Sequence, residues 1–239
     1  MFGDFSSLKT IHKINKFSSK TKNLNRKKII VCVPNTLIYF FKKKLKSKDI
    51  SLGAQNCHYH ESFGPFTGSV NALMLKKIGA EYIILGHSEN RLEGESNSLI
   101  KKKIISSLNR KLNVIFCIGE TYKEKKSGKT FKILRKQLKE SLTKDLNINK
   151  IIIAYEPVWC IGANKIPTKN YLLKITKFIK NEYIKIYRAK KIPKILYGGS
   201  VNPKNIRLFT SISDIDGFLI GGASQSSKKF IDIIKNYYK

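Results

Sequence analysis

Short apolar segments recur along the chain, and polar stretches separate them. Seven such segments begin at positions 29, 51, 82, 114, 151, 194 and 217 and read IIVCVP, SLGAQN, YIILGHSE, VIFCIGE, IIIAYEP, KILYGG and GFLIGGAS. Apolar runs of this length, bounded by polar, Gly or Pro residues, are typical of parallel strands that are buried on both faces. The pattern therefore predicts seven strands of one parallel sheet.

Between these runs, apolar residues return at the spacing of helices. Thr168 is expected to cap the helix that contains Tyr171, and Ser6 or Ser7 to cap the first helix. Strand and helix alternate to the end of the chain without a linker, so residues 1–239 are expected to form a single α/β domain. The helical sets are Leu8/Ile11/Ile14/Phe17, Ile100/Ile104/Leu108, Leu134/Leu138/Leu142, Tyr171/Ile175/Phe178/Ile179 and Phe230/Ile233/Ile234.

Two architectures fit this alternation. A doubly wound sheet would carry a glycine-rich fingerprint after its first strand, and the sequence has none there. A closed (β/α)8 TIM barrel is favoured, because it gathers the carboxyl ends of its strands at one rim. The unusual residues of this sequence stand at those ends, although only seven of eight strands are visible; they are Asn56, His87, Glu89, Glu120, Glu156 and the glycine pairs 198–199 and 221–222.

The formal charge of +31 suggests a polyanion partner at first sight. The lysines, however, are spread over the polar faces of the predicted helices instead of one block interleaved with aromatic residues. We expect no specific nucleic-acid partner, only salt-sensitive attraction to polyanions and to an anionic substrate. A basic polyanion-binding protein is kept as the non-enzyme alternative.

The sequence also bears on cellular location and metal binding. The sequence lacks both a secretory signal and an apolar stretch of about 18 residues, so no membrane partner is expected. The four cysteines are scattered, which favours a reducing, cytoplasmic location. The sequence CHYH at 57–60 is interpreted as a polar loop, because no second ligand pair accompanies it.

Glu156 follows a buried strand and precedes Pro157, where an unpaired carboxylate would cost several kcal/mol. His87 follows another strand, and glycine pairs with Ser200 follow the last two, where barrels commonly cradle a phosphate. Across one pocket, a carboxylate and an imidazole suit proton abstraction beside a carbonyl. Each residue alone has a plainer interpretation, as an ion-pair partner or a core histidine.

Six segments together resemble the triosephosphate isomerase family, in order from about residue 29 to 239: GAQN, ILGHSENR, FCIGET, AYEPVWCIG, YGGSV and DGFLIGGAS. The resemblance implies interconversion of dihydroxyacetone phosphate and D-glyceraldehyde 3-phosphate in glycolysis and gluconeogenesis. It implies Glu156 as base, His87 as neutral electrophile and Glu89 in support, with no metal or organic cofactor. The phosphate would be held by Gly162, Ser200, Gly221 and Gly222, while Glu120 and Arg91 would be structural.

The resemblance also implies a lid that swings from Pro157 and spans roughly Val158 to Lys165. Two details depart from the family: Cys160 replaces Ala, and ANK at 163–165 replaces a Thr-Gly-Lys-like stretch. We expect altered lid kinetics with intact chemistry. The family is a dimer, and the loop CHYHESFGPFTGSV at 57–70, with Phe66 and Thr67 at its tip and Gly68 in the turn, predicts a homodimer.

The family opens with a strand that ends in an Asn-Trp-Lys-Met-like stretch, and Met1 matches the Met of that stretch. The expectation is an upstream translation start and, for residues 1–239 alone, an open barrel with a gap between the strands from 29 and from 217. Little activity is expected until about ten residues ending in Asn-Trp-Lys are restored. A truncated, weakly active or inactive isomerase-like protein and another phosphosugar isomerase are the enzyme-class alternatives.

Overall fold

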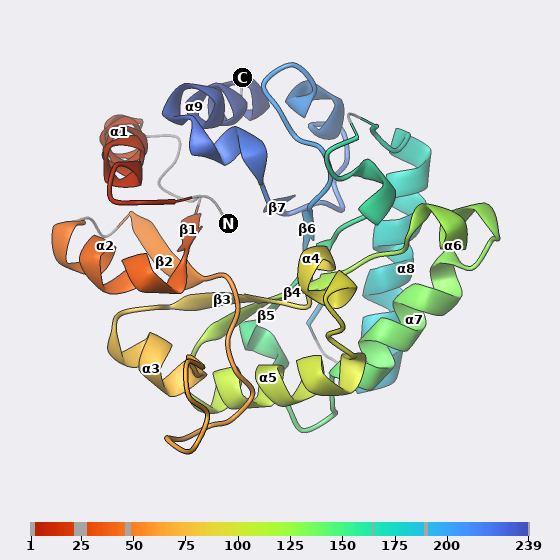
Figure 1. The fold of residues 1–239 in the computed structure, drawn as a ribbon. Helices are drawn as coiled ribbons and strands as arrows, with labels where there is room; N and C mark the ends of the chain where they lie inside the picture. Colours follow the sequence, from red (N-terminus) through yellow and green to blue (C-terminus); the bar gives the residue numbers. More distant parts are fainter. Residues whose placement is uncertain (1–2, 22–27, 46–48, 164, 189–190, 239) are drawn as a thin grey trace.

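The computed structural model describes residues 3–21, 28–45, 49–163, 165–188 and 191–238. They contain one sheet of seven parallel strands whose spatial order is the order of the sequence. This is a curled sheet of the TIM-barrel type, with the connecting helices around its outside (Figure 1). The strands are β1 (Ile29–Val33), β2 (Ile50–Ala54), β3 (Tyr82–Leu85), β4 (Asn113–Ile118), β5 (Ile151–Tyr155), β6 (Lys194–Tyr197) and β7 (Gly217–Phe218). All seven predicted strands are confirmed.

The helices surround this sheet, and the five predicted from apolar spacing are confirmed as α1, α5, α7, α8 and α9. None of the described helices is long and apolar enough to cross a bilayer. Their bounds are α1 (Ser7–Lys20), α2 (Ile38–Lys44), α3 (Ala72–Lys77), α4 (Ser88–Leu92), α5 (Asn97–Asn109), α6 (Tyr122–Lys126), α7 (Thr130–Ser141), α8 (Lys169–Tyr187) and α9 (Ser227–Tyr237). Short 3-10 turns occupy Asn35–Leu37, Ile148–Lys150, Val158–Cys160 (η4), Ile206–Phe209 and Gly222–Gln225 (η6).

The two predicted helix caps have different outcomes. Thr168 caps α8 as predicted, since its Oγ1 accepts the backbone N–H of Tyr171 at 3.2 Å. The serine cap of α1 is wrong: Ser6 already has helical φ and ψ, which turns its hydroxyl away from the capping position. Asp4 takes the role, because its Oδ1 accepts the backbone N–H of Ser6 at 2.8 Å and of Ser7 at 3.3 Å.

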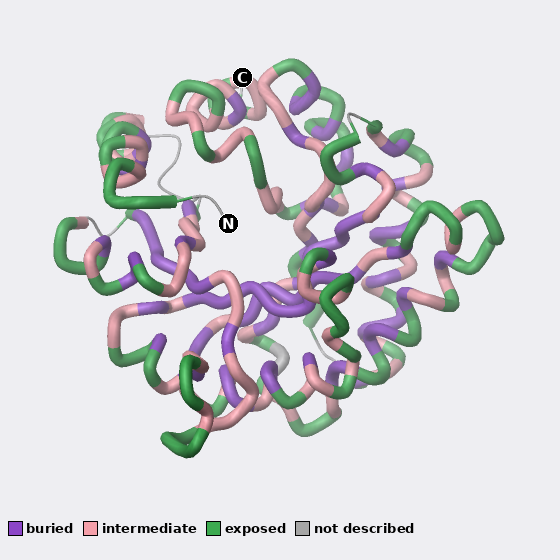
Figure 2. The backbone as a smooth tube through the Cα atoms, viewed as in Figure 1, coloured by how far each residue is buried: buried purple, intermediate pink, exposed green. Residues whose placement is uncertain are grey.

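Both faces of the central strands β2 to β5 are buried, as the continuous apolar runs predicted, whereas the edge strands β1 and β7 are mostly half-buried (Figure 2). On β3, Ile83 and Leu85 join the large core beneath the helices, whereas Tyr82 and Ile84 join a smaller cluster inside the curl. The same alternation along β4 and β5 brings Ile115, Cys117 and Ala154 into the inner cluster. Alternate side chains of one strand therefore stabilise two separate layers.

The sheet is open along one line. Among the described residues, β1 pairs with β2 and β7 with β6, and no backbone bond joins β1 to β7. Figure 1 shows the two strands apart, and Gly3 lies against Pro34, just after β1. The predicted opening between these strands is confirmed, while Met1 lies outside the described residues.

The open edges generate a prediction about stability. We expect an N-terminal extension of about ten residues, strand-forming and ending in Asn-Trp-Lys, to raise the free energy of unfolding by roughly 2 kcal/mol or more, because each cross-strand pair of residues contributes about 0.2–1 kcal/mol and a new strand forms several such pairs. Urea denaturation of both chains measures this. A Gly/Ser extension of equal length is the control, and equal stability of the two extended chains would contradict the expectation.

Candidate active site

Glu156 is placed by the ends of three neighbouring strands. It follows β5 directly, its backbone N–H donates to the carbonyl of Ile118 at 2.8 Å, and only 3% of its surface is exposed. Two glycines leave the space that it fills: a Cβ on Gly119 would lie 1.8 Å from the Glu156 carbonyl oxygen, and a Cβ on Gly198 would lie 2.7 Å from its Cγ. A larger residue at position 119 would displace the Glu156 backbone, and one at position 198 would displace its side chain.

His87 reaches the same rim from β3. Gly86 turns the chain with φ +71°, and His87 then caps α4. Its Nδ1 accepts the backbone N–H of Glu89 at 3.3 Å, which leaves the ring proton on Nε2 in the neutral imidazole. His87 therefore presents an N–H donor from Nε2 toward Glu156.

The two side chains meet. Nε2 of His87 lies 3.0 Å from Oε1 of Glu156, and Oε2 accepts the backbone N–H of Ser88 at 3.3 Å. Cys117 is fully buried nearby, and its pKa is raised well above the usual value, first by burial and then by the charge of Glu156. The buried carboxylate is thus paired with an imidazole and a backbone donor.

Glu156 controls the titration of its partner. Burial lowers the pKa of His87, but the hydrogen bond to Glu156 and the charges of Glu156 and Glu89 raise it, and the net shift is upward. The upward contributions come mostly from Glu156, so a turn of that carboxylate toward a substrate would leave burial to dominate. His87 would then be neutral, as an electrophilic donor requires.

Glu120 and Arg91 are held in structural networks. The fully buried Glu120 accepts hydrogen bonds from the Tyr155 hydroxyl at 3.1 Å, Trp159 Nε1 at 2.9 Å and the Tyr171 hydroxyl at 2.9 Å. Arg91 donates to the carbonyl of Gly86 at 2.7 Å, and so supports the turn before His87. Trp159 lies near the start of segment 158–165 and Tyr171 lies beyond its end, and both are tied to the Glu120 carboxylate.

The residues expected to hold a phosphate lie in exposed loops. Gly162 has φ +67°, and a Cβ at Gly162, Gly221 or Gly222 would meet nothing within 4 Å. The η6 turn begins at Gly222 after β7, and Ser200 follows β6. Backbone N–H groups in such places can bind an anion.

The glycine pair 198–199 departs from the sequence interpretation. It was expected to leave room for a phosphate, but the space is taken by the protein. A Cβ on Gly198 would meet Glu156, and a Cβ on Gly199 would lie 2.2 Å from the Tyr197 hydroxyl. These glycines serve close packing beneath the site.

Two further rim residues are not drawn into the acid–base pair. Asn56 donates to Glu95 at 2.8 Å and accepts from Lys103 at 3.1 Å. Glu89 remains largely exposed, with its Oε2 3.8 Å from Nδ1 of His87. Glu89 can therefore act on His87 through its charge, whereas Asn56 belongs to a separate network.

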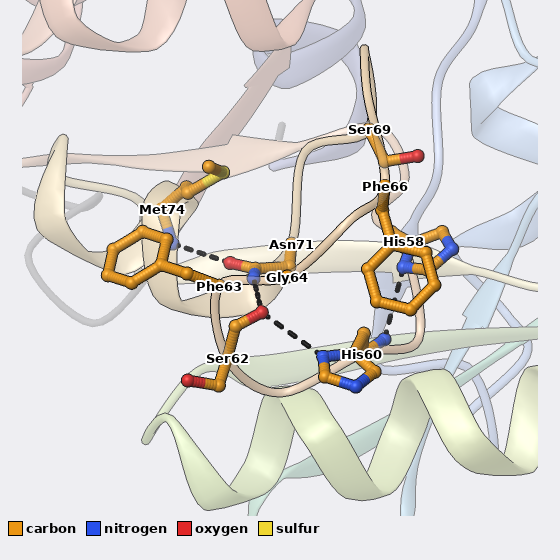
Figure 3. A pocket seen from close by; sticks show the side chains of 9 residues that line it. All are labelled: His58, His60, Ser62, Phe63, Gly64, Phe66, Ser69, Asn71 and Met74. Atoms are coloured by element: carbon orange, nitrogen blue, oxygen red, sulfur yellow. Dashed lines mark hydrogen bonds between the residues drawn. The ribbon is translucent and has the colours of Figure 1, made fainter.

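The loop after β2 forms a small hollow away from the acid–base pair (Figure 3). Phe66, predicted at the exposed tip, instead packs its ring 4.7 Å from that of His58 and 4.5 Å from that of His60. The exposed aromatic is Phe63, with 59% of its surface accessible, and Gly68 makes the predicted turn with φ +83°. Within the described part of the chain, no group of three or more His, Cys, Asp or Glu side chains could hold a metal ion.

Sequence reasoning missed the residues that support Glu156 from outside the rim. The side chain of Gln137, on α7, bonds both the N–H and the carbonyl of Gly119. The available signal was a polar residue beside Leu138 on the apolar face of a predicted helix. Ser88 was missed as well, because it acts through its backbone.

Known proteins resemble this chain in both sequence and fold. A family model described as triosephosphate isomerase matches residues 1–237. The chain is 40% identical over 227 residues to the triosephosphate isomerase of Aquifex aeolicus, covering 94% of this chain and 92% of that protein. It is 42% identical over 229 residues to that of Dictyoglomus thermophilum, covering 93% and 91%. The crystal structure of triosephosphate isomerase from Bartonella henselae has a TM-score of 0.88 at 35% identity, covering 100% of this chain and 96% of that one.

The paired geometry predicts how His87 titrates. We expect its pKa above 6.5 in the parent and below 6.5 in Glu156→Gln, where only the weaker effect of the Glu89 charge still opposes burial. NMR titration of the His87 ring measures both values. The matched control is Glu89→Gln, which removes an exposed carboxylate and should lower the pKa less.

The same shift fixes the sign of a stability effect. A raised pKa in the folded state means that the pair stabilises the fold fully below pH 6.5 and loses this contribution as the pH rises through the folded pKa. Glu156→Gln should therefore lose more stability relative to the parent at acidic than at alkaline pH. An unchanged His87 pKa in this variant would contradict the pairing.

Proposed function

The chain belongs to the triosephosphate isomerase family, and we propose that it interconverts dihydroxyacetone phosphate and D-glyceraldehyde 3-phosphate through an enediolate. The observation that carries the proposal is the 3.0 Å contact between His87 Nε2 and Glu156 Oε1, made where the carboxylate is 3% exposed. The division of roles that follows is already known for this family.

Glu156 is the base in this proposal. It takes a proton from one substrate carbon and returns it to the neighbouring carbon. To do so, its carboxylate leaves the long 3.3 Å bond from the Ser88 N–H and turns into the pocket. The backbone stays fixed, because the Glu156 N–H is bonded to the Ile118 carbonyl at 2.8 Å and the Glu156 carbonyl packs against Gly119. A side-chain rotation on a fixed backbone keeps the base well oriented.

His87 stabilises the charge that develops on the substrate oxygen. Its Nε2–H becomes available when Glu156 turns away, while the Glu89 N–H keeps Nδ1 as the acceptor. A neutral donor fixed in this way suits an oxyanion in a site from which water is excluded. No step of this reaction requires a metal or an organic cofactor.

The phosphate and the lid complete the proposal. The backbone of Gly162, with Ser200, Gly221 and Gly222, is proposed to bind the phosphate. The lid, roughly 158–165, swings from Pro157, covers the intermediate and excludes water. Burial raises the pKa of Cys160 to about 12, so at neutral pH it is a protonated, buried thiol. Its effect on lid kinetics stays a prediction, and Asn164 lies outside the described residues.

We also propose a cytoplasmic location. All four cysteines are free, which suits a reducing compartment. A homodimer is proposed as well. Its support is the loop at 57–70, in which Phe66 packs on His58 and His60 while Phe63 remains exposed. An exposed aromatic on an internally packed loop is suited to a partner surface.

A coupled isomerisation assay tests the function. Glu156→Gln should lower kcat about 10²–10⁴-fold because it removes the base. His87→Gln should lower it about 10²–10³-fold because it weakens oxyanion stabilisation. Glu93→Gln, a change at an exposed carboxylate at the end of helix α4, is the control, and its kcat should match that of the parent. Equal activity in all four proteins would refute the site assignment.

Sedimentation at micromolar concentration tests the dimer. We expect the mass of two chains for the parent and a shift toward one chain for Phe63→Asp, because a charge would be buried at the interface. Tyr122→Asp replaces an aromatic of similar exposure, 57% against 59%, on a different face, and should remain dimeric. A fully active parent with the mass of one chain would contradict the proposal.

A further inference from the structure

Gln137 is a buried polar residue on the inner face of α7. Only 8% of its surface is exposed, and the fully buried Leu134 and Leu138 lie beside it on the same helix. A buried amide costs stability unless both its oxygen and its nitrogen are bonded. Its partner is therefore informative about its role.

That partner is the backbone of a single residue at the site, Gly119. The Gly119 N–H donates to Gln137 Oε1 at 2.9 Å, and Gln137 Nε2 donates to the Gly119 carbonyl at 2.9 Å. The Gln137 side chain thus makes the two hydrogen bonds to Gly119 that the backbone of a neighbouring strand would otherwise make. Two bonds to one residue fix both its position and its rotation.

Gly119 needs this support because the residues before and after it, Ile118 and Glu120, accept the backbone hydrogen bonds from the chain that continues β5, and Gly119 does not. Glu156 donates to the carbonyl of Ile118 at 2.8 Å, and Val158 donates to the carbonyl of Glu120 at 3.0 Å. Gly119 lies between these two bonds and against the backbone of Glu156, where its missing Cβ leaves room. The residue that Gln137 binds, Gly119, is therefore the one that packs against the backbone of Glu156.

We propose that Gln137 is a positioning residue that fixes the catalytic base Glu156 through Gly119. This inference rests on the proposed isomerase function, but the geometry of the Glu156–His87 pair can be read without activity. Without the amide, the N–H and carbonyl of the part-buried Gly119 lose these hydrogen-bond partners, and the backbone turns to find others. A displacement of about 1 Å at a reacting group can cost about 10²-fold in rate.

The test compares two variants that each remove a buried hydrogen bond to the backbone around α7. Gln137→Leu keeps the size of the side chain and removes both bonds to Gly119. Tyr187→Phe is the matched control, because the Tyr187 hydroxyl donates to the carbonyl of Leu138, the next residue, at 2.8 Å. Both variants should lose stability, so a stability effect alone distinguishes nothing.

Only Gln137→Leu should act on the site. We expect its kcat to fall about 10–100-fold with KM changed less than about 3-fold, the pattern of an interaction that matters in the transition state. Its His87 pKa, followed by NMR, should move toward the value in Glu156→Gln. Tyr187→Phe should retain the kcat and the His87 pKa of the parent.

Gln137→Glu provides a conditional rescue. A protonated carboxyl can donate to the Gly119 carbonyl and accept from its N–H, whereas a carboxylate can only accept. The kcat of this variant relative to the parent should therefore rise as the pH falls. A constant ratio would count against the proposal.

The outcomes separate the two proposals. A parent without isomerase activity refutes the proposed function, and the His87 titration then still decides whether Gln137 positions Glu156. An active parent with equal kcat and equal His87 pKa in Gln137→Leu and Tyr187→Phe refutes the positioning role alone.

Discussion

The burial of the Glu156 carboxylate is the constraint on which the rest of the site depends. At 3% exposure it needs donors, and it has them in His87 Nε2 and the Ser88 N–H. It also needs space, which the missing side chains of Gly119 and Gly198 supply. Three strand ends must therefore keep fixed positions so that one charge is tolerated.

A second buried carboxylate shows why these two acids behave differently. Glu120 is held by the Tyr155 and Tyr171 hydroxyls and the Trp159 N–H, at 2.9–3.1 Å from separate segments, and moving it would break all of these bonds. Glu156 is held by a titratable imidazole and a 3.3 Å backbone bond, which a substrate can replace. Burial is common to both, and the kind of donor separates the structural carboxylate from the one proposed as the base.

The fold could be predicted because strands that are buried on both faces need continuous apolar runs in the sequence. The ends of those runs locate the rim of the barrel where the site residues lie. Contacts that depend on three-dimensional packing could not. Ser6 is a residue type that commonly caps helices, but its own backbone is already helical. Gly198 makes room for Glu156 instead of a ligand, and Phe66 packs back on His58. Gln137 is a single polar residue 18 positions from its partner, and no periodicity reveals such a pair.

The position of the open edge limits what it can disturb. His87, Glu120 and Glu156 follow β3, β4 and β5, which each have a strand on both sides. The loop with Gly221 and Gly222 follows β7, which pairs on one side and spans Gly217–Phe218. The acid–base pair is thus built into the continuous part of the sheet, and the loops proposed for the phosphate lie next to the opening. In the proposed reaction, a loss of order at the open edge would therefore affect substrate binding before it affects proton transfer.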